Sequence, residues 1–208
     1  MSVAPYSPAA ERNKQPILEV LRRVLPARGT ALEIASGTGQ HVAWFAAGLS
    51  GWTWQPTEAD TDALPSISAW TAQARLANVR APLWLDVMAP QWPAQGPAFA
   101  EPFDAIYCAN LLHIAPWAMT SALMQGAARH LARDGLLVTY GPYLEHGVPT
   151  TAGNLAFDAS LRLRDPAWGL RLLQDVSGQA QCAGLHLRAR HAMPANNLLL
   201  VFGRNPQG

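Results

Sequence analysis

The chain carries little charge of either sign and almost no lysine. Only 14% of its 208 residues are charged, Lys14 is the single lysine among fifteen basic residues, and the formal net charge is +1. Binding to nucleic acid requires clustered Lys and Arg to neutralise phosphates. The sequence has no block of like charges, so its composition argues against nucleic acid as a partner and against a polybasic membrane-binding segment.

Cysteine and long apolar runs are also scarce. Cys108 and Cys182 cannot form a disulfide framework and lack metal-ligand spacing, so no metal site is expected. No apolar run reaches the roughly 18 residues of a membrane helix, and the first residues lack the apolar core of a signal peptide. We therefore expect a cytoplasmic protein without a membrane partner, a monomer or homodimer. Half of the residues are hydrophobic, which suits one domain over residues 1–208.

Short apolar runs alternate with segments of helical periodicity. Strands are predicted at 30–35, 52–57, 81–85, 103–108 and 136–140, and helices at 13–25, 39–49, 60–77 and 116–132. A loop is expected over 89–102 and a turn at Asp134-Gly135. After Gly141 the alternation stops, which predicts an insertion over about 141–168 with a helical stretch, a helix over 169–183, and closing strands at 185–191 and 198–203. This order predicts an α/β fold, Rossmann-like, with a mostly parallel seven-stranded sheet and helices on both faces.

The segment from Ala31 to His41 carries the most informative motif. A short apolar run is followed by a turn with glycines at 37 and 39, where the backbone can approach a ligand closely. A dinucleotide-binding G-x-G-x-x-G would need glycine at Val42, and there is no P-loop lysine. The pattern E-x-x-x-G-x-G resembles the first motif of class I methyltransferases that use S-adenosyl-L-methionine. Glu33 would then bond the loop backbone or reach the methionine amino group, while Gly37 and Gly39 would lie against the ligand. The alternative is a glycine turn that closes an ordinary strand–helix unit.

Polar residues follow the next predicted strands, whose carboxyl ends form the ligand-binding edge of such a sheet. Glu58 is suited to ribose hydroxyls, Asp86 to the adenine amino group, and Asn110 to the region of the sulfonium, with His113 one turn further. The alternatives are capping acids for Glu58 and Asp86, with Asp60 the better cap, and a core histidine for His113. Four successive strand ends that suit one ligand favour S-adenosyl-L-methionine over a dinucleotide.

Over essentially its full length the chain resembles the methyltransferase-like protein 26 family, also called domain of unknown function 938. The resemblance rests on segments 6–13, 32–41, 54–58, 110–117, 141–143, 157–161, 165–171 and 193–197. Thr57-Glu58 stands where the family often has Ser-Asp, and ribose binding tolerates the longer side chain. The resemblance implies a class I methyltransferase fold with an unassigned substrate.

Family-like residues outside the cofactor positions are the substrate-side candidates. Arg12 and Asn13 are predicted to open the first helix and to close over the cleft as part of a lid formed by residues 1–28, and Arg12 is also a candidate cofactor contact. The candidate bases are His113, Tyr140 and Tyr143. The predicted substrate-binding residues are Asn13, Asn154, Asp158, Arg162, Arg171 and Asn196. The alternatives are local ion pairs among Asp158, Arg162 and Asp165, and turn residues at Asn196 and Asn197.

Together these features predict an S-adenosyl-L-methionine-dependent methyltransferase that acts on a small-molecule acceptor. A sulfonium methyl is already electrophilic, so catalysis needs mainly in-line positioning of the acceptor. The absence of an Asn-Pro-Pro-Tyr motif argues against methylation of nucleic-acid bases. Two alternatives stay open: a non-catalytic module that binds the cofactor or S-adenosylhomocysteine (SAH), and a dinucleotide-dependent oxidoreductase.

Overall fold

The computed structural model describes residues 5–205. The chain forms two compact units, Met1–Tyr107 and Cys108–Gly208, and strand β4 (Phe103–Ala109) runs across the boundary between them. The strands of the main sheet follow the order β3-β2-β1-β4-β5-β9-β8. The predicted α/β fold with a mostly parallel seven-stranded sheet is therefore confirmed. No helix within residues 5–205 is long and apolar enough to cross a lipid bilayer.

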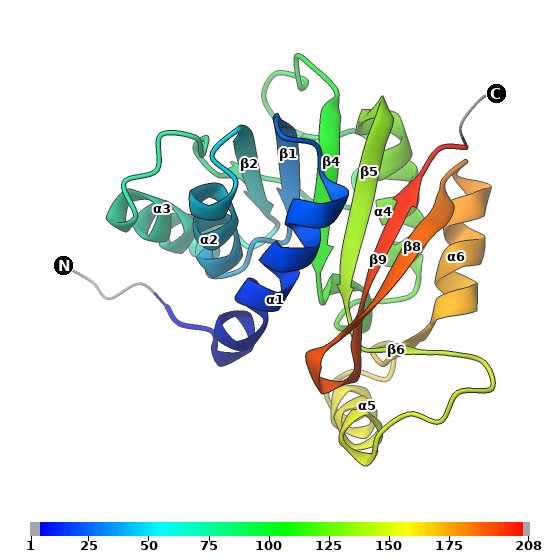
Figure 1. The fold of residues 1–208 in the computed structure, drawn as a ribbon. Helices are drawn as coiled ribbons and strands as arrows, with labels where there is room; N and C mark the ends of the chain where they lie inside the picture. The colour runs from blue at the N-terminus through cyan, green and yellow to red at the C-terminus, as the bar shows by residue number, and fades with distance from the viewer. Residues whose placement is uncertain (1–4, 206–208) are drawn as a thin grey trace. The chain divides into compact units, whose positions relative to one another are not determined.

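The first unit is a run of strand–helix repeats (Figure 1). Its elements are α1 (Pro8–Val24), β1 (Gly29–Ile34), α2 (Gln40–Gly48), β2 (Trp52–Glu58), the short helix η1 (Thr61–Ala63), α3 (Leu64–Gln73), β3 (Leu83–Trp84) and most of β4. β1 pairs in parallel with β2, and β2 with β3. Residues 31–34 of β1 are all buried, as expected for a parallel strand covered on both faces.

Three predicted boundaries in this unit are wrong. α1 begins at Pro8, with the Ser7 side chain accepting a hydrogen bond from the Ala10 amide. The prediction began at residue 13 because it followed apolar periodicity, whereas the start signals are the cap and the proline after it. The helix predicted over 60–77 is η1 followed by α3, which ends at Gln73. The third strand shortens to two residues directly after Pro82, which has no amide hydrogen to donate.

The second unit combines an antiparallel set of strands with helices. Its elements are the end of β4, η2 (Leu111–His113), α4 (Ala118–His130), β5 (Leu131–Gly141), β6 (Tyr143–Leu144), α5 (Ala152–Arg164), β7 (Arg171–Leu172), α6 (Leu173–Cys182), β8 (His186–Met193), η3 (Pro194–Asn196) and β9 (Asn197–Gly203). β9 lies between β5 and β8 and is antiparallel to both. Within this unit α4 and α6 lie beside these strands, and α5 lies at one end of them (Figure 1).

Two further predictions in this unit are corrected. Asp134-Gly135 is not a turn, because Leu131 already adopts an extended conformation (φ −73°, ψ 138°) after α4 and β5 then runs unbroken to Gly141. The helix predicted over 169–183 begins only at Leu173. The residues before it, Arg171 and Leu172, form β7 and pair in parallel with β6. The helical stretch expected in the insertion is α5.

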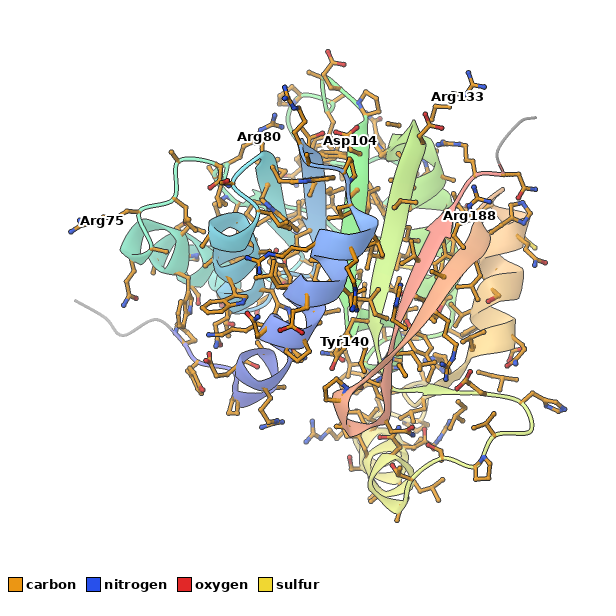
Figure 2. The ribbon with its side chains drawn as sticks, in the orientation of Figure 1. Arg75, Arg80, Asp104, Arg133, Tyr140 and Arg188 are labelled. Atoms are coloured by element: carbon orange, nitrogen blue, oxygen red, sulfur yellow. The ribbon has the colours of Figure 1, made fainter. Side chains whose placement is uncertain are left out.

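Asp104 ties β4 to β1 through a side-chain bond to the backbone. Its Oδ2 accepts hydrogen bonds from the Thr30 amide at 2.7 Å and the Thr30 hydroxyl at 3.3 Å (Figure 2). Asp104→Ala leaves a partly buried amide without its partner, so we expect a loss of about 1–3 kcal/mol of unfolding free energy. Urea denaturation measures this loss. The exposed Asp62→Ala is the control and should stay within about 0.5 kcal/mol of wild type. Equal losses in the two variants would contradict this role.

Candidate cofactor and active site

The turn after β1 combines left-handed backbone with amides that bond within the turn and to β2. Ala35, Gly37 and Gly39 have φ of 55°, 57° and 91°. A left-handed alanine is costly and persists only where its surroundings fix it. The Ser36 amide donates to the carbonyl of Thr57 at 2.9 Å, and the Gly39 amide donates to the carbonyl of Ser36 at 3.0 Å. The end of β2 therefore holds the turn in place.

The two glycines of the turn serve different purposes. A Cβ on Gly39 would lie 2.6 Å from the Cα of Ile67 in α3, so only glycine fits there. A Cβ on Gly37 would meet no atom within 4 Å, and Gly37 is exposed. Helix packing alone thus explains Gly39, as the glycine-turn alternative expected. Gly37 is the position where a ligand can approach the backbone, and ligand contact by either glycine stays a prediction.

Glu58 stands at the end of β2 and reaches the glycine turn. Its Oε2 accepts from the Gly37 amide at 2.8 Å, and its Oε1 accepts from the amides of Ala59 and Asp60 at 2.8 and 3.3 Å. Asp60 caps η1 by accepting from the Asp62 amide, which confirms that Asp60 is the better cap. Glu58 therefore positions the turn, and its bond to a ribose stays a prediction.

Asp86 follows β3 and occupies the geometry of a loop cap. Its Oδ1 accepts from the Met88 amide at 2.8 Å, and its carbonyl accepts from the Ala89 amide at 3.1 Å. The loop-capping alternative is confirmed by these bonds. The other carboxylate oxygen of Asp86 accepts no hydrogen bond from the described residues, and its contact with adenine stays a prediction.

Glu33 is a buried acid without a counter-charge. It is 1% exposed, and its Oε2 has no hydrogen-bond partner within residues 5–205. Burial raises the pKa of Glu33 to about 8; a hydrogen bond with the Ser36 side chain opposes this rise, and the charge of Glu58 adds to it. The amides of Ser36, Gly37 and Gly39 bond other acceptors, and a bond from Glu33 to the loop backbone stays a prediction. A buried acceptor of this kind is costly without a partner, so it suits a donor supplied by a ligand.

Gln40 links the N-terminal segment to the glycine turn. Its Oε1 accepts from the Ser7 amide and from the Thr38 hydroxyl, and its Nε2 donates to Glu11. The sequence interpretation overlooked Gln40, although a polar residue directly after the second glycine was an available signal. The described part of the predicted lid, residues 5–28, is therefore attached beside the turn, while residues 1–4 lie outside the described residues.

The two lid candidates differ in their surroundings. Asn13 is engaged within the unit, since its Oδ1 lies 2.6 Å from Nε2 of His41. Arg12 is exposed and makes no hydrogen bond or ion pair with any residue from 5 to 205. Because α1 starts at Pro8, neither residue opens the helix as predicted. Arg12 remains available to a ligand, and its contact with the cofactor stays a prediction.

In the second unit His113 is a buried histidine without polar partners. It is 1% exposed, and both ring nitrogens lack a hydrogen-bond partner in the described chain. Its ring packs edge-on against Tyr143 at 5.1 Å between centroids. A Cβ on Gly141 would lie 2.1 Å from its Nε2, so glycine at 141 makes room for the imidazole. Asn110, in left-handed conformation (φ 61°), donates its amide to the carbonyl of Tyr140 at 2.8 Å.

The three candidate bases are not equivalent. Burial, with the charge of Arg171 adding to it, lowers the pKa of His113 to about 3, so its imidazole is neutral at pH 7 and keeps a nitrogen that can accept a proton. Burial raises the pKa of Tyr143 above its usual value, and its hydroxyl donates to Thr139 at 2.9 Å. Tyr140 is buried in β5. This geometry favours His113 over either tyrosine, and the base role itself stays a prediction.

The charged residues of the insertion bond mainly to the protein itself. Arg162 Nε lies 2.9 Å from Asp158 Oδ2, and the other Asp158 oxygen accepts from the Leu170 amide at 2.7 Å. The ion-pair alternative is thus confirmed for this pair. It is wrong for Asp165, whose Oδ1 accepts from the Ala167 amide. Binding of an acceptor by Asp158 or Arg162 stays a prediction.

Arg171 holds the segment that carries His113. Its guanidinium donates to the carbonyls of Leu112 at 2.9 Å and Ala115 at 2.6 Å, and the Gly169 amide donates to the carbonyl of His113 at 3.0 Å. These bonds make Arg171 a positioning residue in this arrangement. Contact between Arg171 and an acceptor stays a prediction.

The two asparagine candidates meet each other across the insertion. The Asn154 side chain donates to the carbonyl of Asn196 at 3.1 Å, and the Asn196 side chain donates to the Thr150 hydroxyl. Asn196 is left-handed (φ 55°), as the turn alternative expected, whereas Asn197 is extended (φ −88°), which corrects that expectation. Their roles toward a substrate stay predictions.

Solved structures of methyltransferases share this fold, and three of them serve as examples. An O-methyltransferase family protein from Burkholderia thailandensis aligns with a TM-score of 0.78 at 17% identity, over 96% of this chain and 58% of its own. The calicheamicin-biosynthesis methyltransferase CalO1, in an SAH-bound form, aligns with a TM-score of 0.75 at 14% identity, over 95% of this chain and 55% of its own. A putative methyltransferase from Bacillus halodurans C-125 aligns with a TM-score of 0.65 at 19% identity, over 84% of this chain and 71% of its own. The chain spans less than two thirds of the first two proteins.

These alignments define the fold as that of Rossmann-like methyltransferases. Within that class the family is clear. Residues 4–204 match the family described as "Protein of unknown function (DUF938)", and the chain belongs to it.

The buried Glu33 should make stability depend on pH. Its pKa is raised from 4.5 to about 8 in the folded protein, so folding is favoured by protonation and loses stability as the pH rises between these values. Each pKa unit corresponds to about 1.4 kcal/mol. We expect the free energy of unfolding of Glu33→Gln, measured by urea denaturation, to rise relative to that of wild type as the pH increases from about 5 to about 8.5. The exposed Glu101→Gln is the control, and a pH slope in Glu33→Gln equal to that of wild type would contradict the assignment.

Proposed function

We propose that the protein is an S-adenosyl-L-methionine-dependent methyltransferase that acts on a small-molecule acceptor. The observation that carries the proposal is the buried Glu33 carboxyl, whose Oε2 has no partner among the described residues, together with the open Gly37 turn. The likeness in fold to methyltransferases, one of them SAH-bound, supports it. A cytoplasmic location, a monomeric or homodimeric state and the absence of nucleic-acid and membrane partners belong to the same proposal.

The residues of the first unit fit the cofactor in charge and in space. A ligand ammonium would supply Glu33 with the hydrogen-bond donor that the chain does not, and would favour its ionised form. Gly37 offers backbone without a side chain in the way. Glu58 is already oriented by three amides and would receive ribose hydroxyls. When bound, the cofactor supplies an electrophilic methyl group on sulfur. Asp86 and Arg12 complete the proposed contacts of the first unit. Asn110 of the second unit stays a predicted cofactor contact.

On the acceptor side His113 is the proposed catalytic residue. Its neutral imidazole has a nitrogen free to accept a hydrogen bond from an acceptor hydroxyl or amine and so to orient it. The low pKa makes His113 a weak base, so it serves chiefly for positioning and takes up a proton only where an acceptor proton must leave before transfer. Arg171 and Gly169 hold its backbone, so a reactive geometry is prepared before the acceptor arrives. Asn154 of the insertion and Asn196 of η3 are the polar groups that would orient the acceptor.

Calorimetric titration with SAH tests the proposal through Gly37. Gly37→Asn tolerates the left-handed turn, since asparagine adopts it at low cost, but places a side chain where the ligand would lie. We expect at least about tenfold weaker SAH binding with an unchanged fold, since a lost fit costs on the order of 1.4 kcal/mol or more. Gly147→Asn is the matched control, because Gly147 is also left-handed with open space around it.

Unchanged affinity in a folded Gly37→Asn variant would refute this cofactor site. Titration of the same protein with NAD tests the oxidoreductase alternative: binding of NAD in place of SAH would support it, and absence of NAD binding would exclude it. Incubation with methyl-labelled cofactor and a pool of small metabolites separates turnover from binding alone.

Glu58 should contribute to affinity through the ribose. We expect Glu58→Gln to weaken SAH binding about tenfold, since hydrogen bonds to a charged group are worth about 1.5–3 kcal/mol each. Asp60→Asn should stay within about twofold of wild type. The analogue of SAH without the 2′-hydroxyl separates the ribose role from support of the turn: it should bind wild type more weakly than SAH does, but bind Glu58→Gln as SAH does. A similar loss for the analogue in both proteins would assign Glu58 to the turn alone.

A further inference from the structure

The second unit contains a cavity at the end of its strands opposite to His113. Its volume is about 630 Å³, and it lies where β5 and β8 begin and β9 ends. Leu136, Gly203 and His186 are paired across these three strands and form its floor. Figure 2 shows Arg133 and Arg188 at this end of the unit and Tyr140 toward the other.

Glycine residues make the space available. Gly135, Gly184 and Gly203 all line the cavity. A Cβ on Gly203 would lie 3.2 Å from Cδ2 of Leu136 and 3.6 Å from Cγ of Arg188. Any larger residue at 203 would therefore fill the floor between the flanking strands.

The walls carry three arginines against one acid. Arg204 is fixed, because its guanidinium donates to the carbonyls of Leu131 at 3.2 Å and Ala132 at 2.7 Å. Arg188 stands at a register shift between Leu187 and Ala189, and such bulges re-aim a side chain. Asp134 is the only acidic residue in the lining.

Arg133 and Arg188 have no partners of their own. Neither makes an ion pair or a side-chain hydrogen bond with the rest of the described chain, although Arg190 on the same strand pairs with Glu145. Arg133 and Arg188 are exposed residues of the cavity lining, and their guanidinium groups are unbonded within the described chain, whereas that of Arg204 is already fixed. The guanidinium fork matches the geometry of phosphate oxygens.

The cavity is separate from the proposed methyl-transfer site. Asp134 and Gly141 are seven positions apart along β5, which corresponds to about 23 Å at the rise of an extended strand. Its volume falls within the range of small-molecule sites, roughly 300–1,000 Å³. It therefore does not extend the acceptor pocket expected beside His113.

We propose that this cavity binds a small molecule bearing a phosphate group, held by Arg133 and Arg188 with Arg204 as a fixed wall. The phosphate can come from free phosphate or from a nucleotide, for which Asp134 would receive a hydroxyl or amino group. The proposal does not depend on methyl transfer, because every residue it uses lies at the opposite end of the strands.

Calorimetry with inorganic phosphate, pyrophosphate and AMP tests the proposal on the full chain. We expect at least one of them to bind wild type, with affinity that falls as salt concentration rises. Arg133→Ala/Arg188→Ala should weaken that binding at least about tenfold, equivalent to about 1.4 kcal/mol. Tighter binding of AMP than of phosphate identifies a nucleotide, and equal binding identifies phosphate alone.

The control is Arg80→Ala/Arg164→Ala, which removes the same charge from exposed arginines outside the cavity. Arg188→Lys keeps the charge but loses the fork, and should bind more weakly than wild type. SAH affinity should be the same in all variants, so failure of this site is distinguishable from failure of the cofactor site. The proposal is overturned if no probe binds at about 10 mM, far above ordinary site affinities, or if the two double variants lose binding equally.

Discussion

The close approach of Gly39 to the backbone of Ile67 is the constraint on which the first unit depends. Because a Cβ at 39 would lie 2.6 Å from the Ile67 Cα, the turn and α3 can meet only through glycine. That contact fixes where α2 begins, and so places Gln40 within reach of Ser7 and Thr38. Gly37 is left facing open space. One glycine therefore serves packing, so that the other can serve a ligand.

In each unit a residue proposed for the site carries a buried polar atom that has no hydrogen-bond partner among the described residues. Glu33 lacks a donor to its Oε2, and His113 lacks partners at both ring nitrogens. An unpaired buried polar atom costs about 1–3 kcal/mol, and native proteins contain few of them. The side chains of Glu58, Asp86 and Arg171 instead bond the backbone, so these three residues shape the surroundings of the proposed site.

Much of the fold could be predicted from the sequence. Short apolar runs such as 30–35 and 52–57 predict strands buried in a parallel sheet, and both form such strands. The start of α1 was missed because its signal is a cap at Ser7 and not an apolar pattern. β7 could not be predicted, because two residues pair only when β6 is beside them. At the site, acids at strand ends were visible in the sequence. Which of them would be bonded, as Glu58 is to the Gly37 amide, depends on neighbours brought in by folding.

The bonds from Arg204 to the start of β5 have a consequence for folding of the second unit. The carbonyls of Leu131 and Ala132 receive their donor from a residue 73 and 72 positions later. Until Arg204 docks, those carbonyls depend on water for a donor. Closing a loop of this length has an entropic cost that must be met before the contact forms, and contacts between residues far apart in sequence slow folding. The junction of α4 and β5 is thus completed by a long-range contact and not by its own neighbours in the chain.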